Sequence, residues 1–123
     1  MLINLSNHPP SKWSKKQRQA AEGQFGKIVD LPFPVVPTEA DLDQVIQLVE
    51  EKVEACMKIL IEKRQISKDE SSNQDAIHIM GEMTFVYQFV NKMSEQGILC
   101  VASIEKEESK EFVQFRQYTN ELF

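Results

Sequence analysis

Two kinds of segment alternate along the chain. Short segments are continuous apolar runs, and longer segments are rich in helix-forming residues or have apolar residues at helical spacing. The short runs have the length of buried strands and lie at residues 2–5, 27–31, 76–80 and 98–102. The longer stretches between them predict helices over residues 14–25, 39–64 and 85–97. A fifth strand is expected over residues 112–118. Strands and helices therefore alternate until the last two strands.

Residues with specific backbone preferences mark the ends of these elements. Ser14 is a good N-cap for the first helix, and Gly26 follows its last residue. Prolines within residues 32–37 exclude regular structure there. The T-x-x-D pattern at residues 38–41 resembles a capping box for the second helix. The polar residues 67–75 are expected to form a mobile loop.

This order of elements predicts a three-layer, Rossmann-like α/β fold in a single domain that spans residues 1–123. Right-handed crossovers favour a mainly parallel sheet of about five strands in the order 2-1-3-4-5. The last strand is expected to be antiparallel at the edge, with helices on both faces of the sheet.

Composition and charge narrow the class of protein. Of the 123 residues, 41% are hydrophobic and 27% are charged, which is typical of a globular domain. The net charge of −5 argues against wrapping duplex DNA. No apolar run approaches the roughly 20 residues of a membrane span, and the first residues do not form a secretory signal. A cytoplasmic protein is therefore expected, with Cys56 and Cys100 as reduced, buried thiols.

Polar residues follow the first and third strands, where a ligand site is expected. In an open parallel sheet, ligands bind beyond the carboxyl ends of the strands, at the point where the strand order reverses. The predicted ligand-binding residues are Ser6, Asn7, His8, Gly81, Glu82, Met83 and Thr84, with Asp30 near the end of the second strand as a further candidate. Backbone N–H groups at the start of the third helix favour an anion such as phosphate.

Each candidate also has a purely structural interpretation. Residues 6–8 fit a loop without a ligand, and Gly81 fits a turn that needs a positive φ. Glu82 and Thr84 are suited to capping the third helix. Near a nucleotide, Glu82 is suited instead to a ribose contact or to a role as acid or base.

Several familiar chemistries are absent from the sequence. It contains neither the GxGxxG nor the GxxxxGK[ST] phosphate-binding motif. The histidines and cysteines lack the spacing of metal ligands, so neither a metal nor a cofactor is expected. His78, inside the third strand, and Trp13 are expected to pack rather than to bind a ligand.

Two segments resemble small stand-alone proteins of the CRISPR-associated Rossmann-fold (CARF-like) type, which are found beside type III CRISPR systems. Over about the first 35 residues, an apolar strand leads to LSNHP, then to a helix with W-S-x-x-Q, then to G-x-I-V-D-L-P. The segment HIMGEMTF continues the likeness in the middle of the chain.

The resemblance implies a homodimer that binds a cyclic oligoadenylate second messenger across its two-fold axis, and either degrades or sequesters it. Residues 6–8 would line the phosphate and ribose site, and residues 81–84 the opposing wall. In metal-free cleavage a ribose 2′-hydroxyl attacks its own phosphorus, and the protein orients it and stabilises charge. His8 is then the candidate acid or base, Lys12 the candidate charge stabiliser and Glu82 a further catalytic candidate.

Two other functions remain open at this point. One is a non-catalytic interaction or scaffold domain that uses the acidic helix between Glu39 and Glu62. The other is a nucleoside- or nucleotide-processing enzyme with Glu82 as nucleophile and Asp30 as the second carboxylate. The aromatic-rich end of the chain fits either a dimer interface or a cap on the sheet's own core. It consists of Phe112, Val113, Phe115, Tyr118, Leu122 and Phe123.

Overall fold

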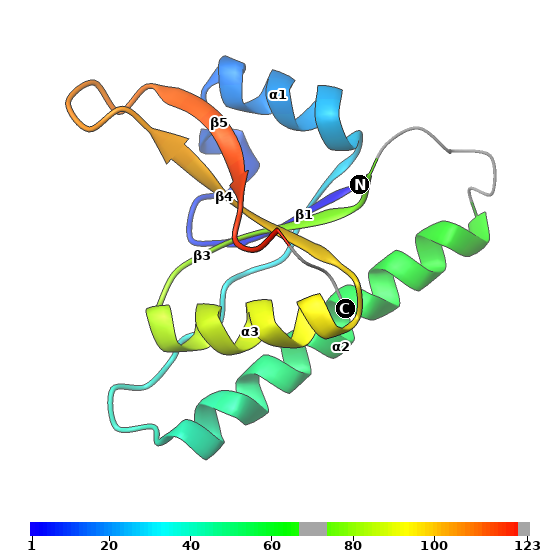
Figure 1. Cartoon of the computed structure of the whole chain (residues 1–123), viewed down its shortest axis with the longest axis vertical. Coiled ribbons are helices and arrows are strands. Elements are labelled where there is room, and N and C mark those ends of the chain that lie inside the picture. Colours follow the sequence, from blue (N-terminus) through cyan, green and yellow to red (C-terminus); the bar gives the residue numbers. More distant parts are fainter. Residues whose placement is uncertain (67–73, 121–123) are drawn as a thin grey trace.

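The computed structural model describes residues 1–66 and 74–120. Its elements are β1 (Leu2–Ser6), the 3-10 helix η1 (Pro10–Lys12), α1 (Lys15–Phe25), β2 (Ile28–Asp30), α2 (Leu42–Ile66), β3 (Ala76–Met80), α3 (Met83–Glu95), β4 (Leu99–Glu105) and β5 (Phe112–Gln117) (Figure 1).

The strands form one sheet in the order β2-β1-β3-β4-β5. All neighbouring pairs are parallel except β4 and β5, which are antiparallel. Helix α1 lies on one face of the sheet, and α2 and α3 lie together on the other (Figure 1). The predicted α/β, Rossmann-like fold and its strand order are therefore confirmed.

Alternation along β1 separates two apolar cores. Ile3 and Leu5 belong to the core formed with α2 and α3. Leu2 points to the opposite face, into the smaller core beneath α1. The same alternation directs Asn4 and Ser6 to the α1 face, and both are buried there. Two buried polar side chains thus interrupt a strand that is otherwise apolar.

The caps of α1 agree with the prediction, whereas the cap of α2 does not. Ser14 Oγ accepts a hydrogen bond from the first turn of α1 at 3.1 Å, and Gly26, with a φ of 86°, ends the helix. At α2, Asp41 and Gln44 form a reciprocal capping box, in which each side chain accepts from the other residue's N–H at 2.9 Å. The capping box predicted to start at Thr38 was therefore wrong, because Asp41 is itself the cap.

Strand β4 is longer than the predicted run at residues 98–102. It pairs with β3 only as far as Val101, and from there it pairs with β5. Because β5 supplies the backbone partners that β3 no longer offers, β4 continues to Glu105. The extension brings Ser103 beside the end of β3.

The aromatic residues of β5 cap the sheet's own core. Phe112 and Phe115 are buried in the core beneath α1. Tyr118, just beyond β5, is partly exposed, and its hydroxyl donates to a carbonyl of β3 at 2.5 Å. Leu122 and Phe123 lie outside the described residues.

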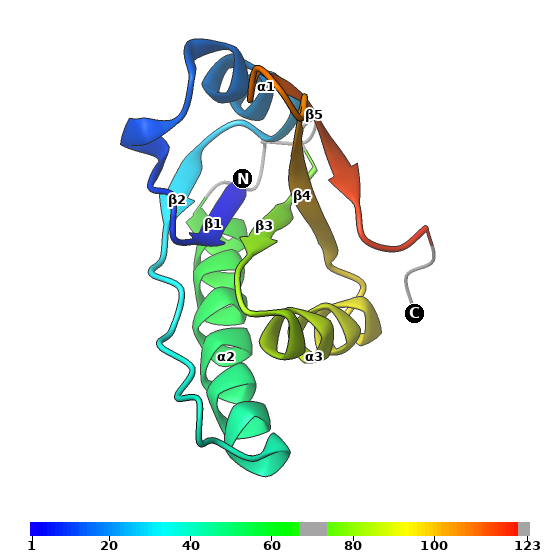
Figure 2. The ribbon, with the colours of Figure 1, turned by 90° about the vertical axis from the view of Figure 1, so that its left-hand side faces the viewer.

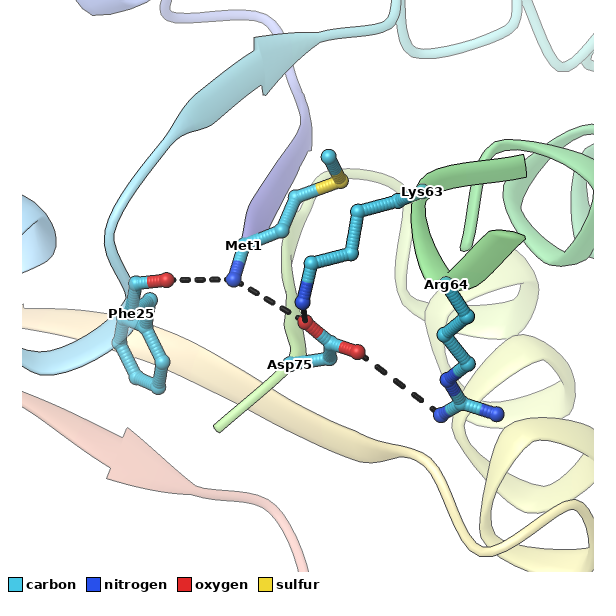
Figure 3. Close-up of polar contacts among 5 residues, drawn as sticks. All are labelled: Met1, Phe25, Lys63, Arg64 and Asp75. Carbon is cyan, nitrogen blue, oxygen red and sulfur yellow. Dashed lines mark hydrogen bonds and ion pairs between the residues drawn. The ribbon is translucent and has the colours of Figure 1, made fainter. Parts of the chain in front are cut away.

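Asp75 gathers cationic groups from separate parts of the chain at the amino end of β3 (Figure 3). Its Oδ1 accepts from the Met1 ammonium and from Lys63 Nζ, each at 3.0 Å. Arg64 lies 3.8 Å from the other carboxylate oxygen. The Met1 ammonium also donates to the carbonyl of Phe25. These contacts tie together the start of β1, the end of α1, the end of α2 and the start of β3.

The Asp75 cluster is largely shielded from water. The side chains of Asp75 and Lys63 are 12% and 14% exposed. Burial by itself raises the pKa of Asp75, but the hydrogen bonds and charges of Lys63 and the Met1 ammonium outweigh burial and lower that pKa. The expectation of a mobile loop was wrong for Asp75, and residues 67–73 lie outside the described residues.

Neither cysteine carries a reactive thiolate. Cys56 and Cys100 are free and buried, and burial raises the pKa of each thiol to about 12. Within residues 1–66 and 74–120, none of the helices has the length and apolar character needed to span a bilayer.

Candidate functional site

Strands β1 and β3 end side by side, and the chain continues from β1 toward α1 and from β3 into α3 (Figure 2). Ser6, the last residue of β1, is in register with Met80, the last residue of β3. The strand ends thus lie side by side, and we call the segments that follow them, residues 6–8 and residues 81–84, the carboxyl edge. The first segment turns toward α1, where the His8 carbonyl accepts from Trp13, and the second begins α3. Ser6 is buried, whereas the other residues of both segments are exposed.

Asn4 lies directly beneath the carboxyl edge, and its side chain makes four hydrogen bonds. Its Nδ2 donates to the carbonyl of His8 at 3.0 Å and to Asp30 Oδ1 at 2.8 Å. Its Oδ1 accepts from Ser6 Oγ at 2.9 Å and lies 2.7 Å from His78 Nδ1. Both amide hydrogens and both lone pairs are therefore in use. Through Asn4, the predicted site residue Asp30 is joined to the carboxyl edge.

The backbone of His8 is held on both sides of the residue. Its N–H donates to Ser6 Oγ at 3.2 Å, and its carbonyl accepts from Asn4 Nδ2 and from Trp13 Nε1, each at 3.0 Å. Trp13 is buried against α1, which confirms its predicted packing role. The loop after β1 is thus fixed by buried donors, while His8 itself is exposed.

His78 extends this network to the neighbouring strands. Because Asn4 Oδ1 can only accept, His78 Nδ1 carries the hydrogen of their 2.7 Å contact. His78 Nε2 is then the acceptor for Ser103 Oγ at 3.0 Å. The ring also packs edge-on against Trp13 and Phe115. The prediction that His78 is a packed core histidine is confirmed.

The buried network keeps His78 neutral. Burial, and secondarily the charge of His8, lower the pKa of His78 to about 4. At neutral pH the chain Asp30–Asn4–His78–Ser103 therefore carries its charge only at the exposed Asp30 end.

Glu82 is the N-cap of α3, and its carboxylate covers the donors at the start of that helix. It accepts from the backbone N–H groups of Thr84 and Phe85 at 3.1 Å and 2.9 Å, and from Thr84 Oγ1 at 2.5 Å. The Thr84 hydroxyl and these two N–H groups hold the pKa of Glu82 below its ordinary value. A phosphate at this helix start would compete with Glu82, so the geometry favours the capping interpretation of Glu82 and Thr84.

Gly81 is required by a close approach, not by a positive φ. Positive φ values among the described glycines occur at Gly26 and Gly97. A Cβ atom on Gly81 would lie 2.4 Å from the ring of Phe33. Phe33 comes from the proline-rich segment after β2 and packs edge-on against Phe85 of α3. The proline-rich segment therefore lies against the carboxyl edge.

We expect Gly81→Ala to destabilise the fold by about 2 kcal/mol, because the new methyl group must displace a packed aromatic ring. Gly23 supplies a matched control, since a Cβ there meets nothing within 4 Å. Gly23→Ala is expected to stabilise α1 by up to about 1 kcal/mol. Urea unfolding of both variants measures the two effects, and a harmless Gly81→Ala would contradict the packing described.

Four exposed basic residues follow the loop after β1: Lys12, Lys15, Lys16 and Arg18. Arg18 donates to the carbonyl of Pro10 at 2.8 Å and so braces the loop, and Lys16 pairs with Glu111 at 3.3 Å. Lys12 and Lys15 are exposed. Lys12 ends η1 on the chain segment that continues from His8.

A cavity of about 800 Å³ lies beside the end of β3, next to Met80 and Gly81. It lies between the end of β3, one face of α3 and the residues that follow β5, Tyr118 and Thr119. Gly81 and Met83 belong both to its lining and to the carboxyl edge. We did not predict this cavity: Val86 and Val90, which line it, belong to the apolar positions that predicted the helix, and the other α3 residues of its lining were not part of that pattern.

Sequence reasoning also missed two residues of the buried network. Asn4 interrupts an apolar strand, and a polar residue at a buried position is the signal that marks it. Ser103 lies beyond the predicted end of its strand. In the described part of the chain, no three side chains of the types His, Cys, Asp or Glu are grouped as metal ligands.

The fold and the carboxyl edge define a Rossmann-like α/β protein with its candidate ligand site at the switch point of the sheet. The chain belongs to the Uncharacterized protein MJ1673 family, whose sequence model matches residues 1–119. Searches of curated proteins and of solved structures found no match.

Proposed function

We propose that the protein binds a cyclic oligoadenylate at the carboxyl edge, across a homodimer, in CRISPR-associated antiviral defence in the cytoplasm. The observation that carries the proposal is the fixed loop at the switch point. The His8 peptide is held by Ser6, Asn4 and Trp13, which leaves Asn7 and His8 exposed just beyond the end of β1. Because the loop is already ordered, binding a ligand there loses less free energy to ordering it.

The phosphates are expected on the β1 side of the carboxyl edge. On the β3 side, Glu82 already occupies the helix donors. On the β1 side, Lys12 and Lys15 are exposed near a loop that Arg18 braces. A few local cations are sufficient for a small anionic ligand even though the net charge of the chain is −5.

His8 is the residue best suited to ring cleavage at this edge. In our proposal its imidazole takes the proton of a ribose 2′-hydroxyl, O2′ bonds to the adjacent phosphorus, and the P–O5′ bond breaks. O5′ takes up a proton from solvent water, the imidazolium returns its proton to solvent, and the product is a linear oligoadenylate with a 2′,3′-cyclic phosphate. Lys12 stabilises the charge on the phosphoryl oxygens. The capped carboxylate of Glu82 is less suited to this step, and its catalytic role stays a prediction.

We expect His8→Ala and Lys12→Ala to weaken binding of cyclic tetra-adenylate by at least tenfold, since each removes a hydrogen bond to a charged ligand. Isothermal calorimetry against cyclic tri-, tetra- and hexa-adenylate measures the affinities. Chromatography of the same samples detects linear products, which His8→Ala should abolish. Lys58→Ala, an exposed lysine on α2, is the matched control and should bind normally.

Each result separates the candidate functions. Binding with intact ligand makes the protein a sequestering protein, and linear products make it a ring nuclease. Sedimentation with and without ligand tests the homodimer. No heat with any of the three rings overturns the proposal and favours the scaffold function, which would use the acidic face of α2.

A further inference from the structure

We propose that the cavity between α3 and the end of β5 is a subsite for a neutral purine ring that carries an amino group, as adenine does. The inference rests on the proposed function, because it gives the base of a bound nucleotide a place beside the carboxyl edge. The cavity, of about 800 Å³, holds more than one purine ring and begins at Gly81, a residue of that edge.

The polarity of the cavity changes along α3. Met83, Tyr87, Asn91 and Glu95 follow one another at four-residue spacing, so they form one stripe along the helix. The half of the stripe nearest the carboxyl edge is apolar and aromatic, with Met83 82% and Tyr87 66% exposed. The far half offers an amide and a carboxylate. A ligand therefore meets a stacking surface first and hydrogen-bonding groups beyond it.

The opposite wall adds a second aromatic ring in a fixed position. Tyr118 lines the cavity from beyond β5, and its hydroxyl donates to the carbonyl of Ile79 at 2.5 Å. Ile79 belongs to β3 and follows His78, the last β3 residue that pairs with β4. Tyrosine rings on two sides of one cavity are well suited to stacking on a planar base.

Charge decides which part of a nucleotide the cavity accepts. Among the described residues that line it, Glu95 is the one that carries a charge. A phosphate is repelled by that carboxylate and finds no cation in the lining. An exocyclic amine donates to Glu95, and the Asn91 amide is able to pair with a ring nitrogen and an amine together. The phosphates thus remain at the carboxyl edge while an amino-bearing purine enters the cavity.

The test compares adenosine, inosine and cyclic tetra-adenylate on the full chain by calorimetry and by ¹⁵N amide shifts. We expect adenosine to shift amides of α3 and of Tyr118 and Thr119, and inosine, which lacks the amine, to bind at least fivefold more weakly. Tyr87→Ala and Glu95→Gln should each weaken adenosine at least fivefold. Both residues are exposed, so both variants should fold, and Glu54→Gln on α2 is the matched control.

The outcomes keep the subsite and the proposed function apart. Cyclic tetra-adenylate that binds these variants as tightly as it binds the unchanged chain overturns the subsite alone. Adenosine that binds in the cavity without any affinity for the rings supports the subsite and overturns the proposed function. If Tyr87→Ala converts a dimer to a monomer and adenosine shifts no α3 amide, a second copy covers the cavity and the subsite is overturned.

Discussion

Replacing Asp75 with asparagine should cost about 3 kcal/mol of unfolding free energy at neutral pH, because it leaves two shielded cations without their shared anion. Lys63 and the Met1 ammonium both lie 3.0 Å from the same Asp75 oxygen. An asparagine oxygen still accepts a hydrogen bond but no longer balances their charge. Urea unfolding of the two proteins at pH 7 measures the difference directly.

The pH dependence of that difference checks its electrostatic origin. The folded-state pKa of Asp75 is lowered, so its contribution is present above the unfolded value of about 4 and is lost as the pH falls below it. The stabilities of the variant and the unchanged chain should therefore converge in acid. Glu111, which pairs with Lys16 and Lys106 on the exposed surface, is the control, and Glu111→Gln should cost far less than the change at Asp75. Equal losses at Asp75 and Glu111 would refute the argument.

The sequence was sufficient for the fold because the decisive signals are local. Ser14 and Gly26 mark the ends of α1 through their own backbone and side-chain preferences, and the structure uses both. The strand order follows from crossover handedness, which needs no side-chain detail. The errors arose where a choice depends on a partner distant in sequence. The end of β4, near Glu105, is determined by β5, and the burial of Asp75 by cations on α2 and at the start of β1.

The candidate site was predictable as a location but not as a mechanism. That β1 and β3 end side by side, with Ser6 in register with Met80, follows from strand order alone. The contact of Phe33 with Gly81 and the four hydrogen bonds of Asn4 do not, since they join residues from different strands and loops. Burying these polar groups requires free energy for desolvation, and their complete hydrogen bonding fixes one geometry. The location of this network beneath the carboxyl edge explains why the loop after β1 is ordered.

His78 should make the protein lose stability in mild acid, through the difference between its folded and unfolded pKa values. The folded-state pKa is about 4, well below the unfolded value of 6.5, because the ring is buried. Between pH 6.5 and pH 4 the His78 ring binds a proton in the unfolded chain but not in the folded chain. The free energy of unfolding therefore falls as the pH falls through this range. A tenfold change in proton affinity corresponds to about 1.4 kcal/mol, so the loss attributable to this ring reaches about 3 kcal/mol.

The two histidines of the chain allow a matched comparison. His78→Gln keeps a hydrogen-bonding side chain at the network and removes the titrating ring, so its stability should fall much less steeply between pH 6.5 and pH 4. His8→Gln removes an exposed imidazole and should retain the steep fall. Urea unfolding at half-unit pH steps gives the slopes, and the same steep slope in His78→Gln would show that other groups carry the acid sensitivity.

The neutral tautomer of His78 matters because Asn4 Oδ1 accepts its Nδ1 hydrogen while Nε2 accepts from Ser103. Protonation of Nε2 forces Ser103 Oγ to become an acceptor, so the same proton that destabilises the fold also rearranges the network beneath the carboxyl edge.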